Sequence, residues 1–217
     1  SYEYSPDNTE GLTIAKRGVG VWQDKVYLAS HDVRLVALDR YTGEQLWRSE
    51  PALTERQRDE MNKTDRIART QAPLVFKGKV FAGTSGYYGG WGAVSAFNAD
   101  DGEILWQDTI VPEDEWVGET WRHGDGASWQ SPAADPVTDT VVFPTGNAAP
   151  MFNGMARPGP NKHTNAVMAF DATSGDRKWT FQLSPHDWWD YDTDTTPRIL
   201  SVEVEGEEKR AVSVEGK

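Results

Sequence analysis

The sequence contains no cysteine, no long apolar run and few cations relative to its acids. Without cysteine, disulfides and thiolate metal sites are excluded. No apolar run approaches the roughly 20 residues that a membrane span requires. The 22 Lys and Arg residues against 34 Asp and Glu residues give a formal net charge of −12. This balance argues against a nucleic-acid partner, because phosphates require clustered cations, and it suits a small-molecule site, a cationic protein partner or life in high salt.

The composition is that of a globular protein. The chain has 217 residues, of which 37% are hydrophobic and 26% charged, and this is enough for one sizeable core or two small ones. It begins at Ser1 rather than Met and ends directly after a strand-like run. We therefore expect it to be a piece of a larger protein.

The most unusual segment covers residues 186–192, which read H-D-W-W-D-Y-D. Carboxylates are rarely buried unless they are paired or bind a metal, and aromatic rings rarely crowd a solvated loop. The chemistry that uses both together is a carboxylate base or metal ligand beside a flat substrate or cofactor.

A pattern of eleven residues occurs three times, at residues 37–47, 96–106 and 169–179. Each copy has Ala at its first position, Asp or Asn at the third, Gly at the seventh and Trp at the last. Strand-like residues lead into each copy, and the Gly supplies the positive φ of a hairpin turn. The Trp is a large apolar plate that can lock one repeat to the next. Taken alone, the repeats describe architecture and not chemistry.

Short strands, glycine turns and a Trp-bearing repeat predict an all-β fold, a β-propeller built of four-stranded antiparallel blades. Further strand signals lie at residues 25–29, 79–83 and 140–143. The wide and uneven spacing of the repeats indicates insertions at residues 53–67, 116–132 and 146–163. Such insertions often build the binding face of a fold.

A series of short motifs runs along the chain beside the repeats. Residues 145–147 read T-G-N, and residues 185–191 read P-H-D-W-W-D-Y. Further matching segments are residues 16–19 (K-R-G-V), 70–73 (T-Q-A-P) and 84–86 (T-S-G), together with Trp129 and Lys217. In this order and at this spacing they resemble the pyrroloquinoline quinone (PQQ)-dependent alcohol dehydrogenases, which are eight-bladed propeller quinoproteins. The repeats resemble that family's tryptophan-docking motif.

The resemblance implies that residues 1–217 form part of a single propeller domain that is incomplete at both ends, with about three to four blades and about half of the ring. It implies PQQ, a flat ortho-quinone with three carboxylates, as the cofactor. The residues that it implies for binding PQQ are Arg17, Thr70, Ser85, Trp129 and Lys217. The metal ligands that it implies are Asn147 and Asp190.

Each implied role suits the chemistry of the side chain. Trp129 would be the platform under the quinone, and Arg17 can hold a carboxylate in bidentate fashion. A bound cation would act as a Lewis acid on the quinone carbonyl. Asp190 would be the general base that takes the hydroxyl proton of an alcohol or sugar while a hydride moves to the quinone. The hydroxyls of Thr70 and Ser85 would reach the anionic rim of PQQ, and Lys217 would stabilise charge on the quinone oxygens.

Each of these residues, taken singly, also has a structural interpretation. Trp129 alone fits a core residue, and Asn147 after a glycine fits a turn. Arg17 and Lys217 fit surface charges, and Asp190 fits a hairpin cap. Their joint occurrence in the family's order is what favours the functional interpretation.

The chain departs from the family in the metal site. The family usually has a metal-binding Glu in a G-x-E-x-G setting, but residues 85–92 contain no carboxylate. Asp192 is the candidate to compensate, because in an extended segment it points to the same side as Asp190. An Asp at this position resembles the lanthanide-using branch, and a similar W-D-x-D occurs in the membrane-bound glucose dehydrogenases. We expect calcium or a lanthanide held by Asn147, Asp190 and Asp192, with a solvated Asp192 as the alternative.

The resemblance also implies a periplasmic or extracellular location, an alcohol or sugar substrate, and a cytochrome c or a quinone as electron acceptor. The acidic surface would suit a basic cytochrome. The remainder of the propeller would be required, so the chain alone is not expected to be active. The alternative function is a non-catalytic propeller of the same repeat type, a scaffold or assembly factor. The joint presence of Trp129, Asn147 and Asp190 favours the enzyme, whereas the missing Glu keeps the alternative open.

Overall fold

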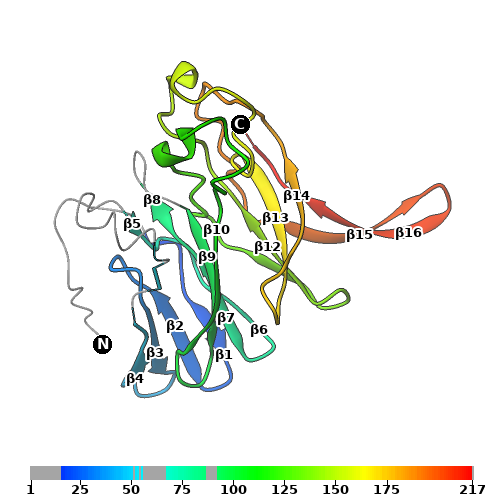
Figure 1. Ribbon diagram of the computed structural model, residues 1–217. Coiled ribbons are helices and arrows are strands. Elements are labelled where there is room, and N and C mark those ends of the chain that lie inside the picture. Colours follow the sequence, from blue (N-terminus) through cyan, green and yellow to red (C-terminus); the bar gives the residue numbers. More distant parts are fainter. Residues whose placement is uncertain (1–15, 51, 54, 56–66, 87–91, 217) are drawn as a thin grey trace.

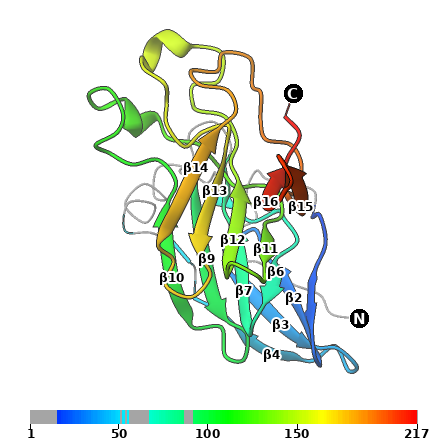
Figure 2. The same ribbon diagram turned by 90° about the vertical axis from the view of Figure 1, so that its right-hand side faces the viewer.

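Three antiparallel sheets of four strands each lie side by side (Figure 1). The computed structural model describes residues 16–50, 52, 53, 55, 67–86 and 92–216, without the side chains of residues 85 and 86. We call the three sheets blades 1, 2 and 3, in chain order. A two-stranded hairpin follows blade 3 and projects away from it (Figures 1 and 2).

The strands of each blade follow one another in the chain. Blade 1 consists of β1 (Gly20–Trp22), β2 (Lys25–Ala29), β3 (Leu35–Asp39) and β4 (Gln45–Arg48). Blade 2 consists of β6 (Leu74–Phe76), β7 (Lys79–Gly83), β9 (Ala93–Asn98) and β10 (Ile104–Thr109). Blade 3 consists of β11 (Ala133–Asp135), β12 (Thr140–Pro144), β13 (Ala166–Asp171) and β14 (Arg177–Gln182). The hairpin consists of β15 (Arg198–Val204) and β16 (Glu207–Ser213).

The first strands of the blades lie next to one another. Strand β1 contacts β6, β6 contacts β11, and β11 contacts β15. From each of β1, β6 and β11 the remaining strands of the blade pair outward in sequence order, all antiparallel. This is the arrangement of β-propeller blades around a central axis. The prediction of an all-β propeller with four-stranded antiparallel blades is therefore confirmed.

The hydrophobic cores lie between the blades. Strands β9 and β13 are buried along all but their last residue. Strand β9 packs between blades 1 and 3, and β13 packs between blade 2 and the hairpin. Tyr27 of blade 1 and Phe97 of blade 2 belong to one cluster, and Phe81 of blade 2 and Phe143 of blade 3 belong to the next. Neighbouring blades thus share one core, so no blade is an independent unit.

The Trp of one repeat lies on the Gly of the next repeat. A Cβ at Gly102 would lie 2.6 Å from the ring of Trp47, and a Cβ at Gly175 would lie 2.6 Å from the ring of Trp106. Both glycines also have left-handed φ values, 78° and 80°. The ring of Trp106 further stacks on Phe170 of blade 3, with centroids 5.9 Å apart. The predictions that the Gly provides the turn and that the Trp locks one repeat to the next are both confirmed.

The Asp or Asn of each repeat closes its turn. Asp39 Oδ1 accepts hydrogen bonds from the backbone N–H groups of Thr42 (2.7 Å) and Tyr41 (2.8 Å). Asp171 accepts the two corresponding bonds at 3.0 and 2.9 Å. These backbone donors favour the charged form, so they lower the pKa of both carboxyls, that of Asp171 to about 2. The third position of the repeat is thus an Asx turn.

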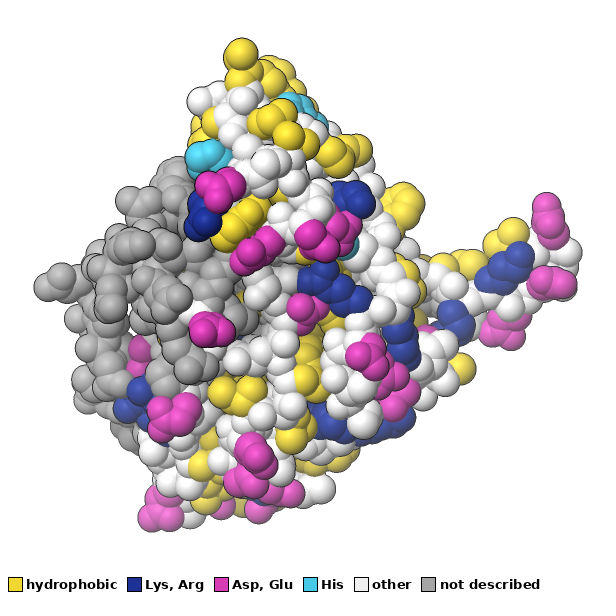
Figure 3. Space-filling model, in the orientation of Figure 1, with side chains coloured by type: hydrophobic (Ala, Val, Ile, Leu, Met, Phe, Trp, Pro, Cys, Tyr) yellow, Lys and Arg dark blue, Asp and Glu magenta, His cyan; other side chains and the backbone are white. Residues whose placement is uncertain are grey.

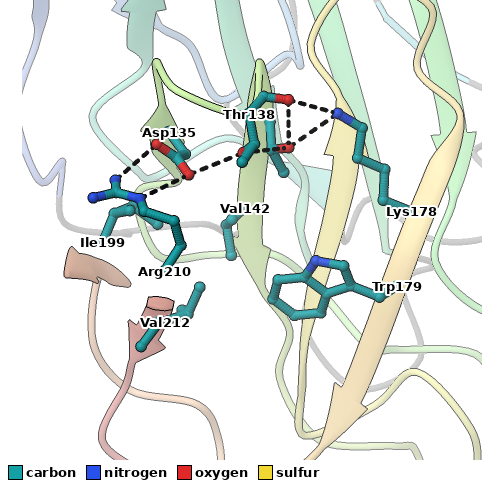
Figure 4. Close-up of a pocket in the computed structure, with 10 residues that line it drawn as sticks. Asp135, Thr138, Val142, Lys178, Trp179, Ile199, Arg210 and Val212 are labelled. Atoms are coloured by element: carbon teal, nitrogen blue, oxygen red, sulfur yellow. Dashed lines mark hydrogen bonds and ion pairs between the residues drawn. The ribbon is translucent and has the colours of Figure 1, made fainter. Parts of the chain in front are cut away.

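The Trp of the third repeat, Trp179, is less covered than those of the first two. Trp179 of β14 is 42% exposed, whereas Trp47 and Trp106 are half-buried. Its ring lines a cavity of about 220 Å³ between blade 3 and the hairpin (Figure 4). Arg210 of the hairpin reaches across to Asp135 of β11 at 2.7 Å.

Long loops gather at one end of the blades (Figures 1 and 2). The loop between β10 and β11 contains the 3-10 helix η1 (Thr120–His123), and the loop between β12 and β13 contains η2 (Gly154–Ala156). Figure 3 shows hydrophobic side chains gathered over this end, where Phe152 and Met155 are 69% and 81% exposed. These loops correspond to the predicted insertions at residues 116–132 and 146–163.

The remaining predicted insertion, residues 53–67, lies mostly outside the described residues. It is followed by strand β5 (Ile67–Ala68), which pairs with β8 (Ser85–Gly86) beside blade 2. Among the described residues, none of the helical segments has the length and apolar character that crossing a membrane requires.

The contact between Trp and Gly predicts a graded cost of adding a methyl group. Gly102→Ala should lower the free energy of unfolding by about 2–4 kcal/mol, because it combines backbone strain with overpacking against Trp47. Gly43 has the same left-handed backbone, φ 77°, but no atom within 4 Å of an added Cβ. Gly43→Ala should therefore cost only about 1 kcal/mol. Chemical unfolding followed by Trp fluorescence measures both, and equal costs would contradict the docking role of Gly102.

Candidate functional site

Residues that are far apart in the chain meet at the loop end of blades 2 and 3. The backbone N–H of Arg17 donates to Thr70 O at 2.9 Å. The hydroxyl of Thr70 donates to Trp129 O at 3.4 Å. Hydrogen bonds thus link three of the residues that the sequence assigned to PQQ.

The side chains of Arg17 and Trp129 lie face to face. The guanidinium carbon is 4.6 Å from the centroid of the ring, within the range of a cation–π contact. The indole is half-buried, and the guanidinium lies over its ring. Partial desolvation lowers the pKa of Arg17 below its usual value. A flat aromatic surface with a cation on it suits a planar, anionic ligand.

The other two residues assigned to PQQ are less fully described. The backbone of Ser85 pairs with Ala68, which brings it next to the segment of Thr70. Its side chain lies outside the described residues, and so does the whole of Lys217. The roles of both in PQQ binding stay predictions.

Gly146 is the point where the Trp platform meets the expected metal ligands. A Cβ at Gly146 would lie 2.6 Å from Asp192 Oδ1 and 3.1 Å from Trp129 Nε1. The backbone N–H of Gly146 donates to Ala127 O at 2.8 Å, which holds the segment beside that of Trp129. Only glycine allows the carboxylate and the indole to approach this closely.

Asn147 and Asp192 are joined directly. The backbone N–H of Asn147 donates to Asp192 Oδ1 at 2.8 Å, and its side-chain Nδ2 donates to Ala148 O at 3.2 Å. Both side chains are nearly fully buried, at 5% and 9% exposure. An amide that donates through its nitrogen presents its oxygen, which is the atom a hard cation binds. Two of the three residues predicted as ligands are therefore neighbours, and Asp192 also has a structural contact that the sequence did not reveal.

The segment that carries Asp190 is a tight turn. The buried carboxylate of Asp187 accepts hydrogen bonds from the backbone N–H groups of Trp189 and Tyr191, both at 2.9 Å. Asp190 lies between these two amides with a left-handed φ of 63°. Such a backbone costs a non-glycine residue about 1–3 kcal/mol, so the turn must be held by its surroundings.

A buried arginine was missed by the sequence reasoning. Arg157 is fully buried and donates to the carbonyl oxygens of Pro150 (3.1 Å) and Met151 (2.9 Å) and to Asp187 O. Carbonyl partners leave no charge pattern in a sequence, so only its isolation in a loop rich in Gly and Pro could have signalled it.

The chemistry of these side chains fits the expected PQQ and metal. An aromatic platform, a cation and a hydroxyl suit PQQ, and one amide with two carboxylates suits a hard cation. Within the described residues, no group of three or more His, Cys, Asp or Glu side chains gathers into a metal site. The predicted ligand set, Asn147, Asp190 and Asp192, contains only two acids, so both the site and the identity of its metal stay predictions.

Known proteins resemble the chain over nearly its whole length. Residues 14–217 match the family described as PQQ glucose/ethanol/alcohol dehydrogenase, β-propeller domain. The quinohemoprotein alcohol dehydrogenase of Comamonas testosteroni is 33% identical over 98% of this chain and 32% of its own length. The lanthanide-dependent methanol dehydrogenase of Methylacidiphilum fumariolicum is 28% identical over 88% of this chain and 35% of its own length. The chain thus spans about a third of these relatives.

Solved structures give the same result. The crystal structure of the Comamonas testosteroni enzyme superposes with a TM-score of 0.83 and 30% identity, over 94% of this chain and 32% of that one. A europium-containing methanol dehydrogenase superposes with a TM-score of 0.82 and 26% identity, over 93% of this chain and 38% of that one.

The contact between Asp192 and Asn147 predicts a change in backbone protection. Asp192→Ala should speed hydrogen exchange at the Asn147 amide by about tenfold or more, because a buried donor loses its acceptor. Asp192→Asn retains an oxygen acceptor and should leave this amide protected. Amide exchange measured residue by residue tests both, with Asp194→Ala as the control in the same segment. Unchanged exchange in Asp192→Ala would show that the bond does not hold Asn147.

Proposed function

The chain belongs to the PQQ-dependent glucose/ethanol/alcohol dehydrogenase β-propeller family, and we propose that its protein oxidises an alcohol or a sugar by hydride transfer to PQQ. The observation that carries the proposal is the meeting of Arg17, Trp129 and Asn147 at one end of the blades. A scaffold would have no need of a cation stacked on an indole ring beside Asn147 and Asp192, two buried residues of metal-ligand type.

In this proposal the chain contributes five residues that bind the cofactor. Trp129 would be the platform, and Arg17 would bind a carboxylate of PQQ in place of its contact with the ring. Thr70 and Ser85 contribute hydroxyls, and Lys217 contributes positive charge near the reducible end. When bound, PQQ supplies an ortho-quinone that accepts the two electrons of the alcohol.

Asp190 is the proposed general base. Its carboxylate accepts the proton of the substrate hydroxyl, which prepares the carbon beside it to give up a hydride. Its backbone is left-handed, and Asp192, two residues on, is tied to Asn147. The base would therefore lie close to Asn147 and Asp192, the other two proposed metal ligands.

The metal in this proposal is calcium or a lanthanide, held by Asn147, Asp190 and Asp192. These are hard oxygen ligands of the kind that both ions take. A lanthanide is supported by the relative whose name records dependence on one. Residues 85–92 contain no carboxylate, so Asp192 would supply the anionic charge that the family's usual Glu provides.

We propose that residues 1–217 are part of one propeller domain whose other blades complete the site. The exposed ring of Trp179 and the open cavity beside it support this, because the rings of the first two repeats are each covered by the next blade. The proposed location is the periplasm or the cell exterior. The proposed electron acceptor is a cytochrome c or a quinone, and the acidic chain suits a basic cytochrome.

Removing the base should separate catalysis from cofactor binding. In the complete protein loaded with PQQ and calcium or lanthanum, Asp190→Asn should lower kcat for alcohol oxidation by about 100-fold to 10,000-fold. Trp129→Ala should instead raise the dissociation constant for PQQ by about tenfold, since it removes the platform. Dye-linked oxidation and fluorescence titration with PQQ measure the two effects. Asp139→Asn, a carboxylate in a distant turn, is the control.

If the protein is instead a scaffold, the same experiment should show neither PQQ binding nor oxidation. A protein that binds no PQQ and oxidises no alcohol or sugar with either cation would be a non-catalytic propeller.

The role of Asp192 in metal binding can be separated from its role in the backbone. Asp192→Asn keeps an acceptor for the Asn147 amide but removes a charge, so the affinity for calcium or lanthanum should fall by about tenfold or more. Metal analysis of the complete protein and a cation titration measure this. Unchanged metal content and affinity in Asp192→Asn would leave Asp192 with a structural role only.

A further inference from the structure

We propose that Arg157 and Asp187 are positioning residues that hold the base Asp190 in its working direction. This inference rests on the proposed function, because it assumes that Asp190 takes a proton from the substrate. Arg157 acts on the backbone of Asp187, and Asp187 acts on the backbone on either side of Asp190. Neither side chain needs to touch the substrate or the cofactor.

The guanidinium of Arg157 joins three separate segments of the chain. It donates to Pro150 O and Met151 O in one loop and to Asn161 Oδ1, at 2.7 Å, after the next turn. Its remaining bond goes to Asp187 O, thirty residues further along the chain. An arginine is rarely buried without need, since its charge must leave water. Here the side chain is fully buried. Its planar donors connect the segment that carries Asp190 to residues 150–151 and to Asn161.

A neighbouring residue strengthens this attachment. The backbone N–H of His186 donates to Pro160 O at 3.0 Å, and its ring Nδ1 contacts Gly159 O at 2.6 Å. The start of the base-carrying segment is therefore fixed to the loop of Arg157 at several points.

Asp187 restrains the backbone on both sides of Asp190. One carboxylate oxygen accepts the N–H of Trp189 and the other accepts the N–H of Tyr191, both at 2.9 Å. These two amides flank Asp190. The carboxylate is nearly fully buried, at 5% exposure, so bulk water does not compete well for the same donors.

The far end of the segment is anchored independently. Asp192 Oδ1 accepts the backbone N–H of Asn147 at 2.8 Å. Asp190 thus lies between two held carboxylates, in a left-handed conformation that a freely moving loop would seldom adopt. The hydrogen bonds of Asp187 and Asp192 therefore restrain the backbone of Asp190 from both sides. This matters for catalysis, because a small displacement of a catalytic group lowers its efficiency steeply.

The test uses the complete protein loaded with PQQ and calcium or lanthanum. Asp187→Asn, which keeps only one oxygen acceptor, and Arg157→Ala should each lower kcat by about 10-fold to 100-fold. The KM for the alcohol and the dissociation constant for PQQ should change by less than about twofold, because the contacts of Trp129 are untouched. Hydrogen exchange at the amides of Trp189 and Tyr191 should become faster in both variants.

Chemical rescue and a matched control complete the design. Added guanidinium ion should restore part of the kcat of Arg157→Ala, and it should do nothing for Asp187→Asn. Arg122→Ala removes an exposed arginine of η1, whose partner is Glu119, and should leave kcat and exchange at both amides unchanged. If Arg157→Ala does not fold, Asp187→Asn alone decides the question.

The outcomes distinguish this inference from the function beneath it. If Asp190→Asn keeps full activity, the proposed role of Asp190 as the base is wrong. If Asp190→Asn is inactive but Asp187→Asn keeps its kcat while the two amides exchange faster, the positioning role is overturned. Parallel losses in kcat and in PQQ affinity would also overturn it, since they would show a general loss of structure.

Discussion

The contact between a tryptophan of one blade and a glycine of the next sets the geometry on which the rest of this structure depends. At Gly102 and Gly175 the ring of the preceding repeat occupies the space where any larger residue would place its Cβ. Both glycines also have a left-handed backbone. The same residue therefore makes the turn and accepts the tryptophan ring of the preceding repeat. Each blade is thereby fixed against its neighbour, and the cores lie between sheets. The loops at the ends of different blades then meet in one place.

The site is a consequence of this alignment. Arg17 precedes blade 1, Trp129 precedes blade 3, and Asn147 follows the second strand of blade 3, yet they lie within a few hydrogen bonds of one another. Gly146 plays the same part at the site as Gly102 and Gly175 play between the blades. Because it has no side chain, Asp192 and Trp129 can approach its backbone closely. The fold and the chemistry therefore use glycine for the same physical reason.

The three acids between residues 187 and 192 divide their work by burial and partner. Asp187 is buried and holds the turn through two backbone amides. Asp192 is buried and holds the backbone of Asn147. Asp190 lies between them, half-buried and with a left-handed backbone, and is the proposed base. Two of the three acids thus have hydrogen-bond partners in the backbone that the sequence did not predict.

The sequence predicts the turns, the strands and several site residues, because these follow from the pattern of side chains. It does not predict hydrogen bonds from side chains to main-chain atoms. The eleven-residue repeat located the turns, and the strands from 25–29, 79–83 and 140–143 appear as β2, β7 and β12. The motifs brought Arg17, Thr70 and Trp129 to one site, as the structure has them. Asp187 accepts from main-chain amides, and three of the four acceptors of Arg157 are main-chain carbonyls. Every residue possesses these groups, so the sequence did not mark them as partners.

The most direct measurement is a crystal structure of the complete protein with PQQ and a calcium or lanthanide ion. We predict that the PQQ ring lies on Trp129, that Arg17 has moved from the indole to a PQQ carboxylate, and that Asn147 and Asp190 face the cation. A structure in which Arg17 still covers Trp129 while PQQ binds elsewhere would contradict the proposed cofactor site.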